Sequence, residues 1–375
     1  MGSARAEISA KNVGRAPGVE EWHRWNNGAR GRFALGGEYD HDAGGAAVNW
    51  LVTGGCGFIG VALVRSLANE DGHAVRVVDN LAVGTREDLR AVCEFVEAFP
   101  GDVGPMTSGS PVELVVGDIL DEELALRAAR GADVIVHLAA NTGVAPSVED
   151  PRADCLANVI GTLNYLEAAR HNDTKRFVFA SSGATIGEVE PPIHEEMSPH
   201  PVSPYGASKL SGEAYCSAYF RTFGVETVSL RFGNVYGPLS NHKNSVIAKF
   251  IKRATRGEAL EIYGDGTQTR DFIYIEDLVR AARLAAAASA VGGEVFQIAT
   301  NAETSVREMV ERLLPVLAAA GIKDVEVRQA APRQGDVMRN YSDTSKAARM
   351  LGWQAEVNLE EGLRRTVEWF IDQGR

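Results

Sequence analysis

The chain has 375 residues, a length that fits two or three domains, or one large domain with a satellite. Apolar residues make up 45% of the chain and charged residues 23%, which excludes a disordered or fibrous protein. A formal net charge of −12 without a basic run argues against nucleic acid as a partner, and no apolar stretch is long enough to predict a membrane span.

Residues 1–46 differ in character from the rest of the chain. They are rich in glycine, asparagine and arginine, and they show neither a helical nor a strand-like hydrophobic period. We predict an N-terminal appendage to the main domain.

From residue 47 to about residue 240, short apolar runs alternate with helical stretches. The predicted strands are 48–53, 74–79, 114–118, 134–138, 177–180 and 227–230, and the clearest predicted helices are 154–170 and 206–223. The segment 97–111 is rich in glycine, proline and serine, which predicts a surface insertion. Fully apolar strands that alternate with helices predict a parallel sheet covered on both faces, a doubly wound α/β (Rossmann) fold.

After about residue 240 this alternation loosens. Helices are predicted over 245–256, 305–320, 344–351 and 359–373, with a short strand at 325–327. We therefore expect a Rossmann domain over 47–240, to which some later segments return, and a smaller mixed α/β lobe over 241–375.

The cysteines indicate the redox environment of the chain. Cys56, Cys93, Cys155 and Cys216 lie far apart and form no CxxC pair, so we expect reduced thiols, no disulfide framework and no metal site. The first residues lack the apolar core of a signal peptide, and we expect a cytoplasmic protein.

A glycine-rich turn, TGGCGFIG over residues 53–60, joins the first predicted strand to the helix that follows it. Gly54 permits the tight turn, Gly57 lets the backbone approach a pyrophosphate, and Gly60 lets helix and strand pack closely. The N-terminus of the helix then supplies N–H groups and partial positive charge to the phosphates. The pattern predicts a bound dinucleotide.

An acidic residue at the end of the second strand selects the kind of dinucleotide. Asp79 follows Gly60 by 19 residues. A carboxylate there accepts hydrogen bonds from the ribose hydroxyls and repels a 2′-phosphate, so NAD is favoured over NADP, although Arg76 and Arg86 are cations nearby. The other residues expected to line the cofactor are at the helix start and at strand ends: Phe58, Ile59, Asn80, Asp118, Ile119, Leu138, Ala139 and Ala140.

The residues Tyr205 and Lys209 place a phenol and an ammonium four positions apart, on one face of a helix. The ammonium and the positive nicotinamide should stabilise the phenolate, so we expect the pKa of Tyr205 to fall towards neutrality. Tyr205 would then be a general base for a sugar hydroxyl, and Ser182, at the end of a strand, would orient the reacting oxygen.

These motifs together resemble the extended short-chain dehydrogenase/reductase family, in its nucleotide-sugar branch. TGGCGFIG, VVDNLAVGTRE, GDI, HLAANTGV, NVIGTLNYLEAAR, SSGATIG, SPYGASK, LRFGNVYGP, YGDGTQTRDFIYIEDL and RQGD occur in family order over about residues 48–373. The resemblance implies an NAD-dependent enzyme whose lobe 241–375 mainly binds the substrate. It also implies a homodimer formed by the 154–170 and 206–223 helices.

The resemblance also implies roles for single residues. Ser182, Tyr205 and Lys209 match the catalytic triad, and Asn158 matches the asparagine beside the active site. The residues that match contacts to the nucleotide sugar are Thr142, Ser182, Asn234, Asn244, Ser245, Arg270, Arg333 and Asp336. Two planar guanidiniums, those of Arg270 and Arg333, suit a diphosphate.

The predicted reaction is inversion of C4 in a UDP-hexose or UDP-hexuronate through a transient 4-keto sugar. Dehydratases of the family carry Asp-Glu after the catalytic hydroxyl residue, and decarboxylases carry a Glu nearby, whereas here Gly183, Ala184 and Thr185 follow Ser182. Small residues leave room for the sugar to turn over.

Hexose and hexuronate remain open as substrates. Ser181, Ser182 and Thr185 are hydroxyl residues suited to a sugar carboxylate. However, an arginine often found after the YGP turn is missing, and only His242 or Lys243 could replace it.

Other reactions also remain open. The Thr142 region resembles CDP-sugar 2-epimerases, and a decarboxylase, a dehydratase, a reductase that releases NADP and a non-catalytic NAD sensor are further alternatives. Intact Ser182, Tyr205 and Lys209 argue against the sensor, and Asp79 argues against the NADP enzyme.

Overall fold

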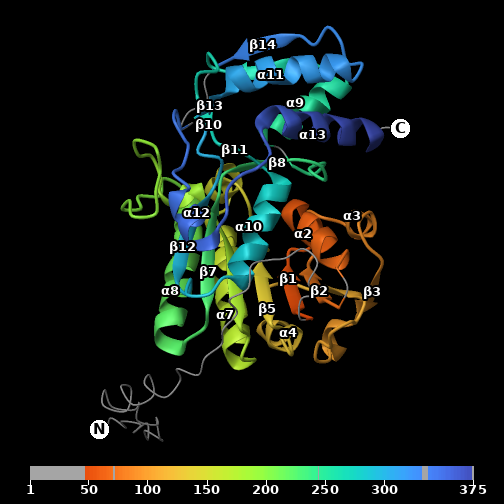
Figure 1. Cartoon of the computed structure of the whole chain (residues 1–375), viewed down its shortest axis with the longest axis vertical. Coiled ribbons are helices and arrows are strands. Elements are labelled where there is room, and N and C mark those ends of the chain that lie inside the picture. The colour runs from red at the N-terminus through yellow and green to blue at the C-terminus, as the bar shows by residue number, and fades with distance from the viewer. Residues whose placement is uncertain (1–46, 71, 244, 332–336, 374–375) are drawn as a thin grey trace, which may run out of the picture. The chain divides into compact units, whose positions relative to one another are not determined.

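Eight parallel strands form the main sheet of the computed structural model, in the order β12-β7-β6-β5-β1-β2-β4-β3 (Figure 1). The structure describes residues 47–70, 72–243, 245–331 and 337–373, so the predicted appendage 1–46 lies outside the described residues. The strands are β1 Asn49–Thr53, β2 Ala74–Asp79, β3 Phe95–Ala98, β4 Val112–Val116, β5 Val134–His137, β6 Arg176–Ser182, β7 Thr227–Phe232 and β12 Glu294–Ile298.

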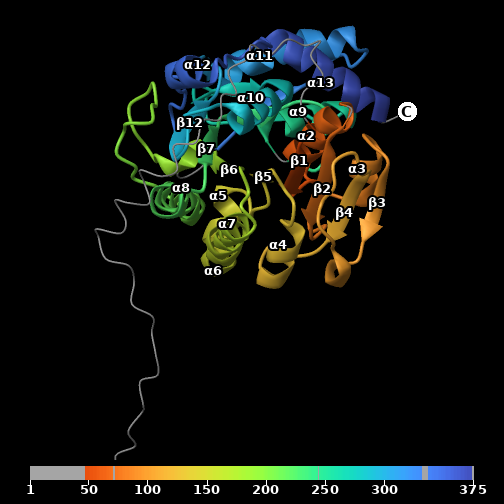
Figure 2. The same cartoon turned by 60° about the horizontal axis from the view of Figure 1, so that its bottom comes forward.

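Helices cover both faces of this sheet (Figure 2). One face carries α2 (Phe58–Ala68), α10 (Ile275–Ala287) and α12 (Ser345–Leu351), and the other carries α4 (Glu122–Ala128), α7 (Gly161–His171) and α8 (Pro204–Phe223). The short helices α3 (Arg86–Arg90) and η1 (Pro100–Asp102) lie in the connections. This arrangement confirms the doubly wound parallel fold that the alternation of strands and helices predicts.

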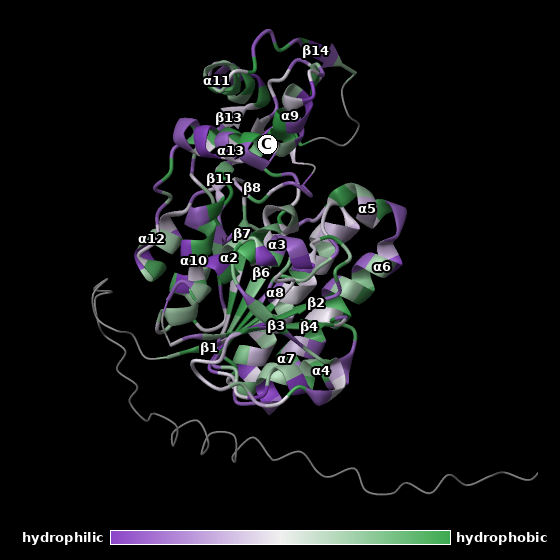
Figure 3. Cartoon of the chain, turned by 90° about the vertical axis from the view of Figure 1, so that its right-hand side faces the viewer, coloured by the Kyte–Doolittle hydropathy of each residue, from purple (hydrophilic) through white to green (hydrophobic). Residues whose placement is uncertain are grey.

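The strands are buried on both faces because their side chains alternate between two hydrophobic clusters. In β1, Trp50 and Val52 pack in the cluster with α2, whereas Leu51 packs on the other side with α4 and α7. The strands are accordingly mostly green in Figure 3, and the outer faces of the helices carry the hydrophilic residues. The first cluster continues into the C-terminal lobe through residues such as Ile251 and Leu313.

Two elements of this domain differ from the prediction. The edge strand β3 was not predicted, because its side chains are half-buried or exposed and it extends into the glycine- and proline-rich segment 97–111. The predicted helix 154–170 contains a π-helical turn, η2 (Leu156–Ile160), between α6 (Pro151–Cys155) and α7, and the short α5 (Val144–Glu149) precedes it. A π turn often marks a functional position, and this one carries Asn158.

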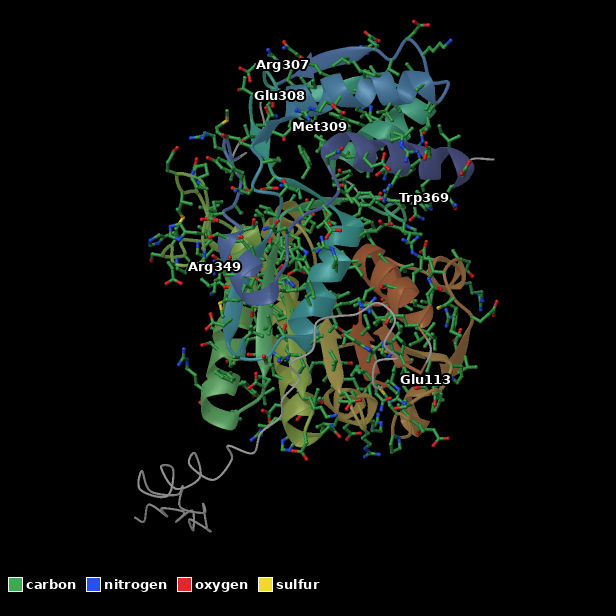
Figure 4. All side chains as sticks on the ribbon, in the orientation of Figure 1. Glu113, Arg307, Glu308, Met309, Arg349 and Trp369 are labelled. Atoms are coloured by element: carbon green, nitrogen blue, oxygen red, sulfur yellow. The ribbon has the colours of Figure 1, made fainter. Side chains whose placement is uncertain are left out.

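The C-terminal lobe is a smaller mixed α/β unit, as predicted. Its helices are α9 (Val246–Thr255), α11 (Val306–Ala319) and α13 (Leu359–Gln373), and its strand pairs are β8 (Asn234–Tyr236) with β11 (Phe272–Tyr274), β9 (Leu260–Tyr263) with β14 (Val327–Ala330), and β10 (Thr269–Arg270) with β13 (Thr304–Ser305). At the start of α11, the Ser305 and Glu308 side chains accept hydrogen bonds from each other's backbone N–H groups. Figure 4 labels Glu308 in this first turn.

One strand boundary after residue 240 differs from the prediction. The strand predicted at 325–327 begins at Val327 and continues to Ala330, because it pairs there with β9. The strand β12 pairs with β7 in the main sheet, and α10 and α12 cover it, so these are later segments that return to the Rossmann domain.

A buried ion pair fixes α8 to the sheet. Glu213 of α8 accepts hydrogen bonds from Arg231 of β7 at 2.8 and 2.7 Å, and both side chains are only 5% exposed. Ser181 of β6 donates a further hydrogen bond to the same carboxylate. The pair therefore joins α8, β6 and β7 beside the end of β6.

We predict that Glu213→Gln lowers the free energy of unfolding by about 3 kcal/mol, because it leaves the Arg231 guanidinium buried without a counter-charge. Glu368→Gln is the matched control. It removes an equal charge from an ion pair whose members are half exposed, and it should cost less than about 1 kcal/mol. Urea unfolding measures both, and equal losses in the two variants would contradict the prediction.

Candidate active site

The predicted cofactor residues gather at the carboxyl ends of the central strands. Chain order reverses between β1 and β5, which are neighbours in the sheet although three other strands separate them in sequence. In doubly wound folds, ligands bind in the crevice at such a reversal. The glycine-rich turn follows β1 at this point, and Leu138, Ala139 and Ala140 follow β5.

The glycines of the turn have the geometry that a dinucleotide loop needs. Gly54 has φ +69° and lies against β5, where an added Cβ would be 2.7 Å from the Ala139 nitrogen. A Cβ on Gly60 would be 2.2 Å from the Gly54 carbonyl oxygen, so helix and strand can pack only without it. A Cβ on Gly57 would be 3.3 Å from the Gly54 carbonyl oxygen and would meet no other atom within 4 Å, so this position is less crowded than Gly54 and Gly60.

Asp79 closes the turn from the end of β2. It is buried, and its two carboxylate oxygens accept hydrogen bonds from the backbone N–H groups of Cys56 at 2.9 Å and Leu81 at 2.8 Å. Burial raises the pKa of Asp79, and these two hydrogen bonds oppose the increase. The carboxylate therefore lies against the glycine-rich turn, where the sequence predicts a ribose contact.

The two nearby arginines are held elsewhere. The Arg76 guanidinium is buried and binds Glu113 and the carbonyl oxygens of Ala128 and Gly104. Figure 4 places Glu113 at the end of the sheet remote from the C-terminal lobe. Arg86 pairs with Glu97 at 2.6 Å. Neither cation is therefore directed at Asp79, which agrees with the predicted preference for NAD over NADP.

The residues predicted at the adenine end lie on neighbouring strand ends. The Asn80 amide donates to Asp118 at 3.0 Å, so the ends of β2 and β4 are joined directly. Both side chains are exposed, whereas Ile119 is buried. Phe58 and Ile59 form the first turn of α2 after Gly57.

Ser182, Tyr205 and Lys209 lie together at the end of β6. Ser182 is the last residue of the strand, Tyr205 lies in the first turn of α8, and a side-chain hydrogen bond joins the two residues. The Lys209 ammonium is buried one turn later, where it donates to the Ala180 carbonyl oxygen at 2.9 Å and lies 5.0 Å from the centre of the Phe179 ring. Ser203 caps this helix by accepting from the Gly206 N–H.

The protein's own groups do not produce the expected fall in the pKa of Tyr205. Burial raises the pKa of this phenol, and the negative charge of Asp154 adds to the increase, while the hydrogen bond with Ser182 opposes it. Burial also lowers the pKa of Lys209 to about 8. The prediction concerned the pair with a positive nicotinamide beside it, and it left out the desolvation that opposes the fall.

A chain of buried hydrogen bonds joins the end of β1 to the helical segment next to this site. The Thr53 hydroxyl lies 2.9 Å from His137 Nδ1, and His137 Nε2 lies 3.3 Å from the Thr162 hydroxyl, which donates to the Asn158 carbonyl oxygen. Burial lowers the pKa of His137 to about 3, so the ring is neutral and one nitrogen donates while the other accepts. The chain links the end of β1 to the π turn that carries Asn158.

Asn158 is buried at the centre of a second group of hydrogen bonds. Its side chain accepts from the Asn141 N–H at 2.8 Å and donates to the Asn141 carbonyl oxygen at 3.0 Å, which fixes the loop after β5. The same amide nitrogen lies 3.0 Å from Asp154 and 3.1 Å from Ser208. Asn158 therefore holds the loop after β5 against α6 and α8.

Three of the predicted substrate residues meet at a cavity of about 200 Å³ whose lining comes from the C-terminal lobe. Asn234, Ser245 and Arg270 line it. The Ser245 hydroxyl precedes α9 and is buried without a hydrogen-bond partner among the described residues, as expected where an anion approaches the N-terminus of a helix. Arg270 donates to the carbonyl oxygens of Thr269 and Val337.

Two other predicted substrate residues do not line this cavity, because Thr142 is exposed in the loop before α5 and Ser182 ends β6. Asn244, Arg333 and Asp336 lie outside the described residues. Ten lining residues were not predicted, among them the polar Glu261, Tyr263 and Gln268. Tyr263 and Gln268 flank the glycines of the YGDGTQTRDF motif, so that motif was the signal that could have indicated them.

Within the described residues, no group of histidine, cysteine, aspartate or glutamate is arranged to hold a metal ion. No helix in the same part of the chain combines the length and the apolar character that crossing a membrane requires.

Comparison with known proteins gives the family. The profile of the NAD dependent epimerase/dehydratase family matches residues 50–299. The chain belongs to this family. Its cofactor is NAD, as the glycine-rich turn and Asp79 predict.

Three relatives illustrate the similarity. UDP-glucose 4-epimerase of Mycolicibacterium smegmatis is 37% identical over 330 residues, which cover 87% of this chain and 99% of the relative. The crystal structure of UDP-glucose 4-epimerase from Thermotoga maritima with UDP-glucose has a TM-score of 0.77 at 37% identity, covering 88% and 100% of the two chains. UDP-glucuronic acid 4-epimerase from Bacillus cereus, in complex with UDP-glucuronic acid and NAD, has a TM-score of 0.76 at 28% identity, covering 87% and 100%.

Two glycine variants separate the packing role of the turn from its binding role. We predict that Gly57→Ala lowers the melting temperature only slightly, because Gly57 has φ −75° and an added Cβ would meet only the Gly54 carbonyl oxygen, at 3.3 Å, yet weakens NAD binding by about tenfold or more by blocking the approach of the phosphates. Gly60→Ala should instead lower the melting temperature. Thermal unfolding and NAD titration measure the two effects, and unchanged NAD affinity in Gly57→Ala would refute the binding role.

Proposed function

We propose that this protein is an NAD-dependent UDP-hexose 4-epimerase. The observation that carries the proposal is the grouping of Ser182, Tyr205 and Lys209 at the end of β6, two strands along the sheet from the strand that the glycine-rich turn follows, and without a carboxylate in the turn after Ser182. The similarity to UDP-glucose 4-epimerases over nearly the whole of their length supports the same reaction.

The residues would divide the work as follows. When bound, NAD supplies the hydride chemistry by accepting hydrogen from C4 of the sugar and returning it to the opposite face. Tyr205 removes the proton from the C4 hydroxyl and later gives it back. Ser182 orients that oxygen by hydrogen bonding, and the charge of Lys209 favours the phenolate. Gly54, Gly57, Gly60 and Asp79 would hold the cofactor.

The nucleotide would be gripped while the sugar turns. Asn234, Ser245 and Arg270 would bind the diphosphate at the cavity, and we propose the same role for Asn244 and Arg333 and a ribose contact for Asp336. Inversion requires the 4-keto sugar to present its other face. The site has room beside Ser182, since an added Cβ on Gly183 would meet only the Phe232 carbonyl oxygen, at 3.9 Å.

The structure favours a neutral hexose over a hexuronate. Two of the hydroxyls suited to a sugar carboxylate are used within the protein, because Ser181 donates to Glu213 and the fully buried Thr185 donates to the Ser182 carbonyl oxygen at 2.9 Å. His242 pairs with Asp88 at 2.9 Å, and the Lys243 ammonium lies 6.0 Å from the centre of the Phe58 ring. No group that would prefer a carboxylate at C6 is thus directed at Ser182 among the described residues.

The proposal predicts conversion of UDP-glucose to UDP-galactose by the purified protein without added cofactor. NMR of a panel of UDP-, dTDP- and CDP-sugars, with UDP-glucuronate included, measures which carbon is inverted. Turnover of UDP-glucuronate alone would refute the hexose assignment, inversion at C2 of a CDP-sugar would refute the C4 assignment, and consumption of added NAD(P)H would indicate a reductase.

The same assay tests the base. Tyr205→Phe should lower kcat by about 10²–10⁴-fold while UDP-sugar binding persists, since only the ionisable hydroxyl is lost. Tyr215→Phe, on the exposed side of the same helix, should leave kcat unchanged. Equal activity in both variants would refute the assignment of Tyr205.

We also propose a homodimer. Exposed apolar side chains gather on the predicted interface helices and the segments next to them, namely Val144, Val148, Leu156, Ile160, Tyr215 and Phe223. An exposed group of this kind is typical of a protein contact. Sedimentation should give the mass of a dimer, and Ile160→Asp should give monomers, whereas Met350→Asp on α12 should not; a monomeric wild-type protein would refute the proposal.

A further inference from the structure

Asp154 is a buried acid beside the active site that the proposed mechanism does not use. It lies in α6 and is 2% exposed. Its Oδ1 accepts a hydrogen bond from Asn158 at 3.0 Å, whereas its Oδ2 is buried and has no hydrogen-bond partner among the described residues. An unpaired carboxylate oxygen is costly to bury, so stability alone does not account for an acid at this position.

Asp154 is connected to the reacting groups through α8. Asn158, which binds Asp154, also lies 3.1 Å from the Ser208 hydroxyl, and that hydroxyl donates to the Tyr205 carbonyl oxygen at 3.0 Å. A continuous path of hydrogen bonds therefore runs from α6 to the first turn of α8. The carboxylate also acts through its charge, since it raises the pKa of Tyr205 and opposes the lowering of the pKa of Lys209 by burial.

We propose that Asp154 is a positioning residue for the Tyr205–Lys209 pair. Its carboxylate holds the Asn158 amide in place and provides the buried negative charge that both members of the pair face. This inference rests on the proposed function, because it assigns Asp154 to the step in which Tyr205 accepts a proton.

The other groups that surround Tyr205 and Lys209 do not act on both of these residues, whereas Asp154 does. Tyr205 faces Ser182 from β6, and Lys209 faces Cys216 from its own helix, a thiol whose pKa burial raises to about 12. His137 at the end of β5 is neutral at neutral pH, and β6 presents the uncharged Phe179 ring and Ala180 carbonyl oxygen to the amine. Of the groups that these elements present, only Asp154 acts electrostatically on both members.

The test is the pH dependence of kcat/KM in Asp154→Asn. Activity requires Tyr205 to lose its proton and Lys209 to keep its own, which gives an acid limb and an alkaline limb. Removing the negative charge should lower both pKa values, so both limbs should move to lower pH by about one unit. Asp150→Asn is the matched control, because Asp150 is an exposed acid at the N-terminus of the same helix, where asparagine caps equally well.

A second measurement follows the ionisation of Tyr205 directly and does not require turnover. Near-ultraviolet absorption follows tyrosinate formation with pH, and the difference between each protein and its Tyr205→Phe partner isolates Tyr205. The Tyr205 signal should appear at lower pH in Asp154→Asn than in wild type. If Asp154→Asn does not fold by circular dichroism, Asp154→Ala serves in both measurements.

The outcomes are separable. A reduced rate with unmoved limbs and an unmoved tyrosinate signal would make Asp154 purely structural and overturn the proposal. Equal shifts in Asp154→Asn and Asp150→Asn would also overturn it. A wild-type protein that inverts no sugar while the tyrosinate signal still shifts would refute the proposed function and leave the positioning role standing.

Discussion

The placement of α8 on the end of β6 is the constraint on which the site depends. The helix carries the phenol and the amine, and the strand carries the serine that they must meet. The Glu213–Arg231 ion pair and the hydrogen bond from Lys209 to Ala180 fix the helix at two levels along the strand. Both contacts are buried, so water does not weaken them, and a small shift of the helix would leave charges unpaired. Lys209 thus has a structural contact besides the chemical role that we propose for it.

The cofactor side of the molecule depends on a different constraint, the absence of side chains. Three segments pack closely at the turn after β1, because Gly54 lies against β5, Gly60 against the turn itself, and Gly84 against the Cys56 carbonyl oxygen, where a Cβ would be 1.9 Å away. Asp79 then binds the turn from the second strand. The turn is therefore rigid on its inner side, as a phosphate site that does not reorganise on binding should be.

The sequence predicted these parts unequally. The strands of the central sheet and the turn TGGCGFIG were predictable because their signals are local, namely apolar runs and glycines at fixed spacing. The edge strand β3, the register of β14 and the lining of the cavity by Glu261 depend on pairing with distant segments, which no local pattern records. The π turn was missed for the same reason, since the side chain of Asn158, which it carries, makes hydrogen bonds to the distant residues Asn141 and Ser208. The rise that burial causes in the pKa of Tyr205 was not predicted, because burial is a property of the folded chain.

The electrostatics of the site follow from where its charges are buried. A buried phenol and a buried amine both resist ionisation, and each would be a poor catalyst alone at neutral pH. A carboxylate placed beside them cannot help both equally, because it favours the charged amine and disfavours the phenolate. The protein thereby gives up some ionisation of Tyr205 to keep Lys209 cationic. That exchange suits an enzyme in which a positively charged cofactor lies next to the phenol, since the cofactor adds the positive charge that the protein's own groups withhold.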